Sequence, residues 1–125
     1  MNNPGLIKAF VVVAVVAAFR IVKFGADDHH VLASALGTDA HIGVTGAVVP
    51  NAAESPIDIT MTGIAEVEFG GVVTRGDLLT SDALGRAIVA APALGANVRI
   101  VGQAMSSGVL GDIGSVHLQA SQIKG

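Results

Sequence analysis

The residues with the clearest capacity for chemistry stand together in one run, Asp27-Asp28-His29-His30. Carboxylates and imidazoles bind metal ions and transfer protons. In an extended segment neighbouring side chains point to opposite sides, so Asp27 and His29 could share a metal ion, whereas Asp28 and His30 could not join them. No further ligands follow at a spacing typical of a metal motif. We interpret the run as a solvated turn and expect no metal ion and no cofactor.

Other catalytic constellations are equally weak. The sequence has no Gly-x-Ser-x-Gly elbow for a serine nucleophile, and its serines stand beside glycine or aspartate in expected turns. Glu66 and Glu68 share the polar side of an expected strand, where a solvated surface is the ordinary explanation. The absence of cysteine excludes disulfides, thiolate zinc sites and a cysteine nucleophile. We expect no catalytic residues and no enzymatic activity.

The stretch from Gly70 to Ala87 alternates short apolar pairs with glycines and small acidic or hydroxyl residues. This composition is typical of tight turns between short strands. The tripeptide Arg75-Gly76-Asp77 also matches a motif of adhesion ligands, but a turn already accounts for its Gly-Asp half. We expect this stretch to fold a sheet back on itself twice, with the rest of the chain packed around it.

Composition limits the possible partners. The 125 residues suffice for one domain, and with 51% apolar and only 14% charged residues, part of the surface is expected to be covered by a partner. Residues 1–24 carry three basic and no acidic side chains, whereas residues 25–125 carry four basic and ten acidic ones. An acidic body with few aromatic residues argues against nucleic-acid binding.

Period-two alternation gives the fold class. Residues 57–69 place apolar side chains on one parity and polar ones on the other, which predicts a half-buried strand with a bend at Gly63. Further short strands are expected over 31–35, 41–45, 87–89, 98–104 and 115–119. About eight such strands predict an all-β fold, a compact small β-barrel or β-sandwich (jelly-roll-like) with an extended N-terminal arm.

The arm contains the run AFVVVAVVAAF at residues 9–19. This run is about half the roughly 20 residues needed to span a bilayer, and no small-residue cleavage site of a secretory signal follows it. Its β-branched valines favour an extended arm or a strand instead of a membrane segment. We expect residues 1–19 to form the arm and residues 20–125 to form a single β domain.

Several segments, in this order and spacing, resemble the capsid cement, or head decoration, proteins of tailed bacteriophages and prophages. The segments are Arg20-Ile21-Val22-Lys23-Phe24-Gly25, Thr38-Asp39-Ala40-His41-Ile42-Gly43-Val44, Glu68 to Asp82 with Gly85-Arg86-Ala87, Ile100-Val101-Gly102-Gln103-Ala104 and Gly111-Asp112-Ile113-Gly114. The resemblance implies a non-enzymatic virion protein that binds the outer surface of the capsid and clamps adjacent major capsid protein subunits. It also implies a β-rich body that self-associates as a dimer or trimer, and it brings no catalytic residues.

We hypothesise that the arm makes the contacts by adding a strand to a neighbour or by laying aromatic residues into its groove. The expected capsid or neighbour contacts are Leu6, Phe10, Val12, Val13, Val15, Val16 and Phe19. One alternative is a small β-barrel carrier or ligand-binding module, although no lysine stands at an expected hairpin tip as a lipoyl carrier requires. A small hydrolase or metal enzyme is a third possibility.

Overall fold

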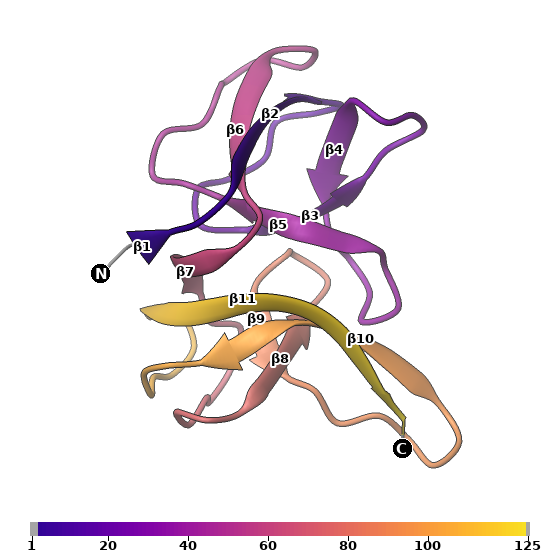
Figure 1. The fold of residues 1–125 in the computed structure, drawn as a ribbon, viewed down its shortest axis with the longest axis vertical. Coiled ribbons are helices and arrows are strands. Elements are labelled where there is room, and N and C mark those ends of the chain that lie inside the picture. The colour runs from indigo at the N-terminus through magenta and orange to yellow at the C-terminus, as the bar shows by residue number, and fades with distance from the viewer. Residues whose placement is uncertain (1–2, 125) are drawn as a thin grey trace.

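The computed structural model describes residues 3–124, and over this range the chain forms eleven strands and no helix (Figure 1). The expected all-β class and compact small barrel architecture are confirmed. Two bodies of strands lie one above the other in Figure 1, with the N-terminal half of the chain forming the upper body and the C-terminal half the lower one.

The upper body is a closed five-stranded barrel in the order β2-β4-β3-β5-β6. Its strands are β2 (Ile7–Val12), β3 (Ile21–Phe24), β4 (His30–Ala33), β5 (His41–Thr45) and β6 (Pro56–Thr60). The parallel pairing of β2 with β4 closes the ring, whereas the other neighbours pair in antiparallel fashion. Closure leaves no unpaired sheet edge in this body.

The lower body is a six-stranded sheet in the order β1-β7-β11-β10-β8-β9. Its strands are β1 (Asn3–Pro4), β7 (Gly63–Glu68), β8 (Leu78–Ser81), β9 (Ala87–Val89), β10 (Asn97–Ala104) and β11 (Ile113–Lys124). A parallel bridge joins Phe69, just after β7, to Ala87 at the start of β9. This bridge brings β9 back to the β7 side, so the sheet curls around its own apolar residues.

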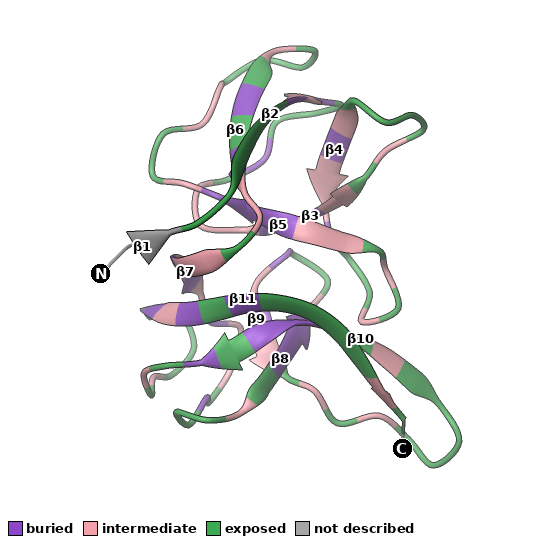
Figure 2. Cartoon of the chain, viewed as in Figure 1, coloured by how far each residue is buried: buried purple, intermediate pink, exposed green. Residues whose placement is uncertain are grey.

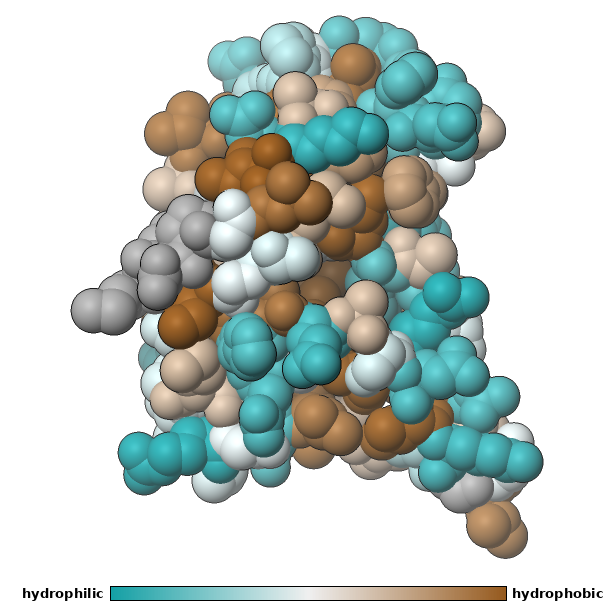
Figure 3. All heavy atoms as spheres, in the orientation of Figure 1, coloured by the Kyte–Doolittle hydropathy of each residue, from teal (hydrophilic) through white to brown (hydrophobic). Residues whose placement is uncertain are grey.

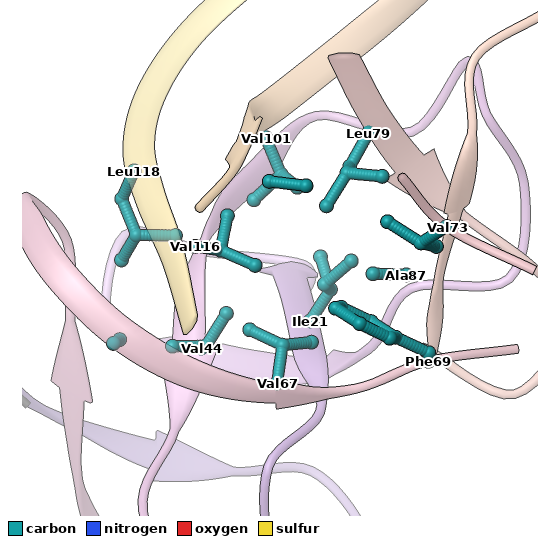
Figure 4. Close-up of a cluster of buried hydrophobic side chains, with 12 residues drawn as sticks. Ile21, Val44, Val67, Phe69, Val73, Leu79, Ala87, Val101, Val116 and Leu118 are labelled. Atoms are coloured by element: carbon teal, nitrogen blue, oxygen red, sulfur yellow. The ribbon is translucent and has the colours of Figure 1, made fainter. Parts of the chain in front are cut away.

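Each body has an apolar core, and the layer formed by β3 and β5 belongs to both. In β3, Val22 packs into the barrel core, while its neighbour Ile21 packs into the core of the lower sheet. Val44 of β5 joins Ile21 in the lower core, and both side chains are buried. Figure 4 shows Ile21 and Val44 pointing from the barrel strands toward Val116, Phe69 and their neighbours. Since successive residues of a strand face opposite sides, one strand can serve two cores.

The prediction of a single strand over residues 57–69 is wrong, because this segment is divided between the two bodies. β6 contributes Ile57 and Ile59 to the barrel core, whereas β7 contributes Ala65 and Val67 to the lower core. Gly63 lies at the division with a φ of +88°, a backbone conformation that side-chain-bearing residues rarely adopt. The bend expected at Gly63 is therefore the crossing from one body to the other.

The N-terminal segment is integrated into both bodies. β1 pairs with β7 in the lower sheet, and β2 lies between β4 and β6 in the barrel. Residues 3–12 are therefore paired within the chain's own fold, and no extended arm separates from the body at residue 19. Residues 9–12 of the valine-rich run belong to β2, as one of the two interpretations of the sequence expected, but their partners lie in their own barrel. Residues 13–19 form bends and turns instead of a strand.

The last strand is longer than the expected 115–119. β11 pairs with β7 through residues 113–118, a bulge follows at residues 119–120, and residues 121–124 pair with β10 alone. This outer part of the β10–β11 hairpin extends past the rest of the lower body, where Figure 2 shows it mostly exposed. We call residues 97–101 and 119–124 the C-terminal ribbon.

Candidate interaction surface

The structure divides the seven expected contact residues into two groups. Phe10, Val12 and Val16 are almost fully buried in the barrel core, packed among residues such as Val31 and Ile59. For these three, the expectation of contact with a neighbour is corrected, because their side chains already have partners within the chain. The apolar alternation of β2 therefore fills its own barrel.

The other expected contacts reach the surface to different extents. Leu6 is 54% exposed, Val15 is 60% exposed and Val13 is 40% exposed, whereas Phe19 is only partly accessible. Val13 lies against the backbone of Gly25, beside Phe24, whose ring is also exposed on one side. Figure 3 shows apolar side chains gathered on the face where β2 and β6 lie. The barrel therefore presents apolar groups on its outside, as a contact surface requires.

The acidic and histidine run forms a clamp at one end of the barrel. The Nδ1 of His30 lies 2.8 Å from Asp27 Oδ1, and its Nε2 lies 3.0 Å from Glu54 Oε1. A neutral imidazole has only one N–H, so only the charged ring donates to both carboxylates. Both hydrogen bonds raise the pKa of His30, and the hydrogen bond with Asp27 has the larger effect. The sequence allowed Asp27 and His29 to share a metal ion; in the structure Asp27 Oδ1 contacts the ring of His30 and accepts from the backbone N–H of His29 at 2.9 Å.

A second polar group joins the two bodies. His41 Nδ1 lies 2.9 Å from Ser34 Oγ, and its Nε2 lies 3.4 Å from Thr80 Oγ1 on β8. A serine beside a histidine could be a nucleophile and its base. Here Ser34 is fully buried, and burial lowers the pKa of His41 and keeps the ring neutral. The arrangement links β4 and β5 to the lower sheet and offers no access to a substrate.

A charged network makes a further link between the bodies. Arg20, just before β3, donates to both carboxylate oxygens of Glu68 and to the carbonyl of Leu84. Asp82 accepts a hydrogen bond from Arg86 Nε at 2.9 Å, and Arg86 reaches Glu68 at 4.0 Å. Glu68 is thus part of an ion-pair network and is not the solvated surface carboxylate that the sequence suggested.

The tripeptide Arg75-Gly76-Asp77 forms a tight turn. Asp77 Oδ2 accepts from the Thr74 N–H at 2.9 Å, and Gly76 has a φ of +95°. The backbone of the turn is also fixed on β10, because the Gly76 N–H donates to the carbonyl of Ala104. The turn therefore accounts for the glycine at position 76 and occupies one oxygen of the Asp77 carboxylate.

One open hollow lies between the loop at residues 46–55 and the start of β6. It has a volume of about 520 Å³ and is lined by Val48, Val49, Pro50, Pro56, Ile57 and Asp58. Its size is within the range of small-ligand pockets, but its lining offers one charged group and no convergent set of polar side chains. The interior of the barrel is filled by its own core residues and leaves no lumen for a ligand.

Within residues 3–124, no cluster of three or more histidine, aspartate or glutamate side chains is placed to hold a metal ion. The same part of the chain contains no helix with the length and apolar character to cross a membrane.

No protein-family model and no curated protein matches this chain. Among solved structures, it is similar to the crystal structure of the head fiber gp8.5 N base of bacteriophage phi29, with a TM-score of 0.71. The similarity covers 96% of this chain and 98% of that chain, at 15% sequence identity. The chain shares its fold with a phage head fiber base. Because the two chains coincide over nearly their whole lengths, both bodies of strands belong to the shared fold.

Two features of this surface were missing from the sequence interpretation. Phe24 was not among the expected contacts, although it lies at the end of β3 with its ring 6.2 Å from that of Phe10. The C-terminal ribbon was also missed, because QASQIK at residues 119–124 has no strong alternation of apolar and polar residues. The alternation at Val116 and Leu118 does not extend into these residues, because the bulge moves the next apolar residue, Ile123, to the opposite parity.

Proposed function

We propose that this chain is a non-enzymatic structural protein of a phage head, which binds the outer surface of the capsid and clamps adjacent major capsid protein subunits. The observation that carries the proposal is the fold likeness to a phage head fiber base over nearly the whole of both chains. The order of the sequence segments that resemble cement proteins supports it independently.

The contact surface in this proposal is the outside of the barrel. Leu6, Val13 and Val15 are the expected contacts that remain accessible, and the neighbouring Phe24 adds an exposed aromatic group. Burying apolar surface contributes about 25 cal/mol per Å², before the cost of ordering the partners is subtracted. Each site can therefore be weak, because many copies on one shell act together.

Head binding is tested with heads of the encoding phage that lack this protein. Purified protein is added to them, and the amount that sediments with the heads is measured, followed by cryo-electron microscopy of the bound particles. We expect ordered density on the exterior. Protein that stays in the supernatant at saturating concentration would contradict head binding.

The contact surface is tested with the double variant Val13→Asp and Val15→Asp. Two carboxylates in an apolar interface are costly to desolvate, so we expect at least a tenfold loss of head binding. The matched control is Val48→Asp, which changes a 91% exposed valine in a loop outside the expected contacts. Equal binding by the double variant and the control would show that another surface docks.

The clamp is tested separately from binding. Heads with and without the bound protein are heated, and release of their contents is followed. A clamp across subunits should raise the temperature of release, because opening the shell then also breaks the bound contacts. If the protein binds but does not change the temperature of release, it is a head-binding protein and the proposed cement role is wrong.

A further inference from the structure

Residues 47–53, which connect β5 to β6, form a surface segment that we call the strap. Val48, Val49 and Pro50 of the strap line the hollow described above, together with residues of β6. Val49 also packs against the barrel core. None of residues 47–53 makes a hydrogen bond to another part of the described chain. The strap is therefore kept on the barrel by apolar contact and by the residues at its two ends.

Glu54 forms the end of the strap next to β6, and its backbone is strained. Its φ is +58°, a left-handed conformation that costs free energy for most residues with a side chain. Two contacts hold Glu54 in place. Its N–H donates at 2.8 Å to the carbonyl of Val12, and its Oε1 lies 3.0 Å from Nε2 of His30. Without the His30 contact, one backbone hydrogen bond alone opposes the relaxation of this strained turn.

Two carboxylates, and no other charged group of the described chain, interact with the ring of His30. The turn before β4 supplies Asp27, whose Oδ1 lies 2.8 Å from Nδ1 of the ring. The loop before β6 supplies Glu54. Asp28 and His29, in the same turn as Asp27, do not interact with the ring. The neighbouring positions of β2 and β3 are uncharged, and they are Val11, Val13 and Gly25.

Loss of the ring proton affects the two carboxylates unequally. A neutral imidazole has one N–H and can donate to only one of them. Asp27 is the better acceptor, because its contact is shorter and its Oδ1 also accepts from the backbone N–H of His30, whereas Glu54 is 65% exposed. The proton therefore stays on Nδ1, and Nε2 presents a lone pair to the Glu54 carboxylate. Two acceptors repel each other, so the Glu54 contact is lost first.

We propose that His30 is a pH-sensitive latch of the strap: the charged ring holds Glu54 and keeps the strap closed, and the neutral ring releases it. On release, the Glu54 backbone can leave its left-handed conformation and Val49 can separate from the barrel core. The hollow then widens, and Ile57, which is almost fully buried beside it, gains access to solvent.

The strap should be closed at acidic pH and should open as the pH rises. The hydrogen bond with Asp27, followed by that with Glu54, raises the pKa of His30 above its ordinary value of 6.5. The latch is therefore complete below about pH 6.5 and is lost as the pH rises through the folded-state pKa. This device does not depend on head binding, and it is tested on the purified chain alone.

Thiol labelling measures the opening of the strap. The chain has no cysteine, so Val49→Cys introduces one thiol at the position that packs against the core. The matched control is Val48→Cys, because this neighbouring side chain is 91% exposed and its labelling reports only the effect of pH on thiol chemistry. The rate for Val49→Cys is divided by that for Val48→Cys. We expect this ratio to rise about threefold from about pH 6 to about pH 8, because exposed ion pairs are weak.

Two further substitutions separate the latch from other effects of pH. His30→Arg carries a permanent charge with several donors, so the labelling ratio should stay low at both pH values. His30→Ala removes both hydrogen bonds, so the ratio should be high at both. The chain with His30 should move between these limits. A ratio that does not change with pH in this chain, or that rises as much in either variant, overturns the proposal.

Hydrogen exchange tests the latch in the unsubstituted chain. After correction for the intrinsic effect of pH on exchange, the Glu54 N–H should lose about threefold in protection from about pH 6 to about pH 8. The control is the Met61 N–H at the other end of β6, which donates to the carbonyl of Leu6 at 2.7 Å and should keep its protection. Unchanged protection of Glu54, or an equal loss at both amides, would reject the latch.

Discussion

Arg20 and Glu68 form the ion pair that joins the barrel to the lower sheet. Arg20 Nη2 lies 3.2 Å and 3.3 Å from the two carboxylate oxygens of Glu68, at the point where the Glu68 N–H also donates to the carbonyl of Phe19. The two side chains retain about a fifth of their exposure, 19% and 22%. Each side chain has therefore lost part of its hydration and interacts with the other instead. Removing either residue would leave its partner partly buried without this interaction.

Removing the carboxylate should destabilise the fold. Glu68→Ala leaves Nη2 of Arg20 without its acceptor, while Nη1 keeps the carbonyl of Leu84, and we expect a loss of about 1–3 kcal/mol in the free energy of unfolding. The control is Asp58→Ala on the exposed side of β6, where we expect a change within about 0.5 kcal/mol. Urea denaturation measures both values. A Glu68→Ala variant as stable as the control would show that the pair has no net effect on stability.

The shared layer should make the two bodies unfold together. Ile21→Ala removes a fully buried side chain of the lower core from a strand of the barrel. We expect a loss of about 2–5 kcal/mol. Amide hydrogen exchange in β2 and in β11 should accelerate together, because both bodies lose the same support. Acceleration confined to β11 would mean that the barrel persists without the lower sheet; Leu94→Ala, at an exposed loop, is the control.

Barrel closure should depend on a glycine in β5. A Cβ at Gly43 would collide with the backbone carbonyl of Thr60 and with the side chain of Ile59 on the adjacent β6. Because backbone cannot give way as a flexible side chain does, we expect Gly43→Ala to cost about 1–3 kcal/mol or more. A Cβ at Gly46 would meet nothing within 4 Å, so Gly46→Ala is the matched control. Thermal unfolding compares the two, and equal midpoints would contradict the close approach.

The His30 clamp should make stability depend on pH. The hydrogen bond with Asp27, followed by that with Glu54, raises the pKa of His30 above its ordinary value of 6.5. A raised histidine pKa means that the protonated ring favours the folded state. Its contribution is therefore complete below about pH 6.5 and is lost as the pH rises through the folded-state pKa. The pKa of Asp27 is lowered, chiefly by its hydrogen bond with His30, so this carboxylate stays charged in the same range.

Two measurements check the clamp. NMR titration should give His30 a pKa above 6.5, and Glu54→Gln should reduce it, because one of the two carboxylates is then neutral. In denaturation experiments, the stability advantage of the wild type over His30→Gln should shrink as the pH rises from about 6 to 8. An advantage that is constant or grows over this range would reverse the expected sign.

Alternation of apolar and polar residues was sufficient to predict the fold class and several strands. It identified Ile57, Ile59, Val67 and Phe69 as inward-facing, and all four are buried. It could not show that Gly63 sends the two halves of this segment into different cores, because alternation reports that one face is buried and not what buries it. β3 escaped prediction for a related reason: Ile21 and Val22 are both buried, and a two-sided strand has no polar face to mark it.

The candidate surface was harder to predict than the fold. The valine-rich N-terminal run has the composition of a segment that docks on a neighbour, and also that of a core strand. The partner strand β6 begins at Pro56, more than forty residues after the run starts, so only the assembled barrel distinguishes the two. Polar partners such as Arg20 and Glu68 are similarly distant in sequence, and no local pattern links them.

The order of the strands has a consequence for synthesis on the ribosome. Every strand of the barrel lies before residue 61, so the barrel can close before β8 to β11 have been made. At that stage Ile21 and Val44 face water, because Val116 and Leu118, which pack with them in the lower core, come last. The nascent chain then displays an apolar face that the finished protein never shows. Chaperones that bind apolar faces can bind this one during the interval. The interval ends when β11 leaves the exit tunnel and covers the face.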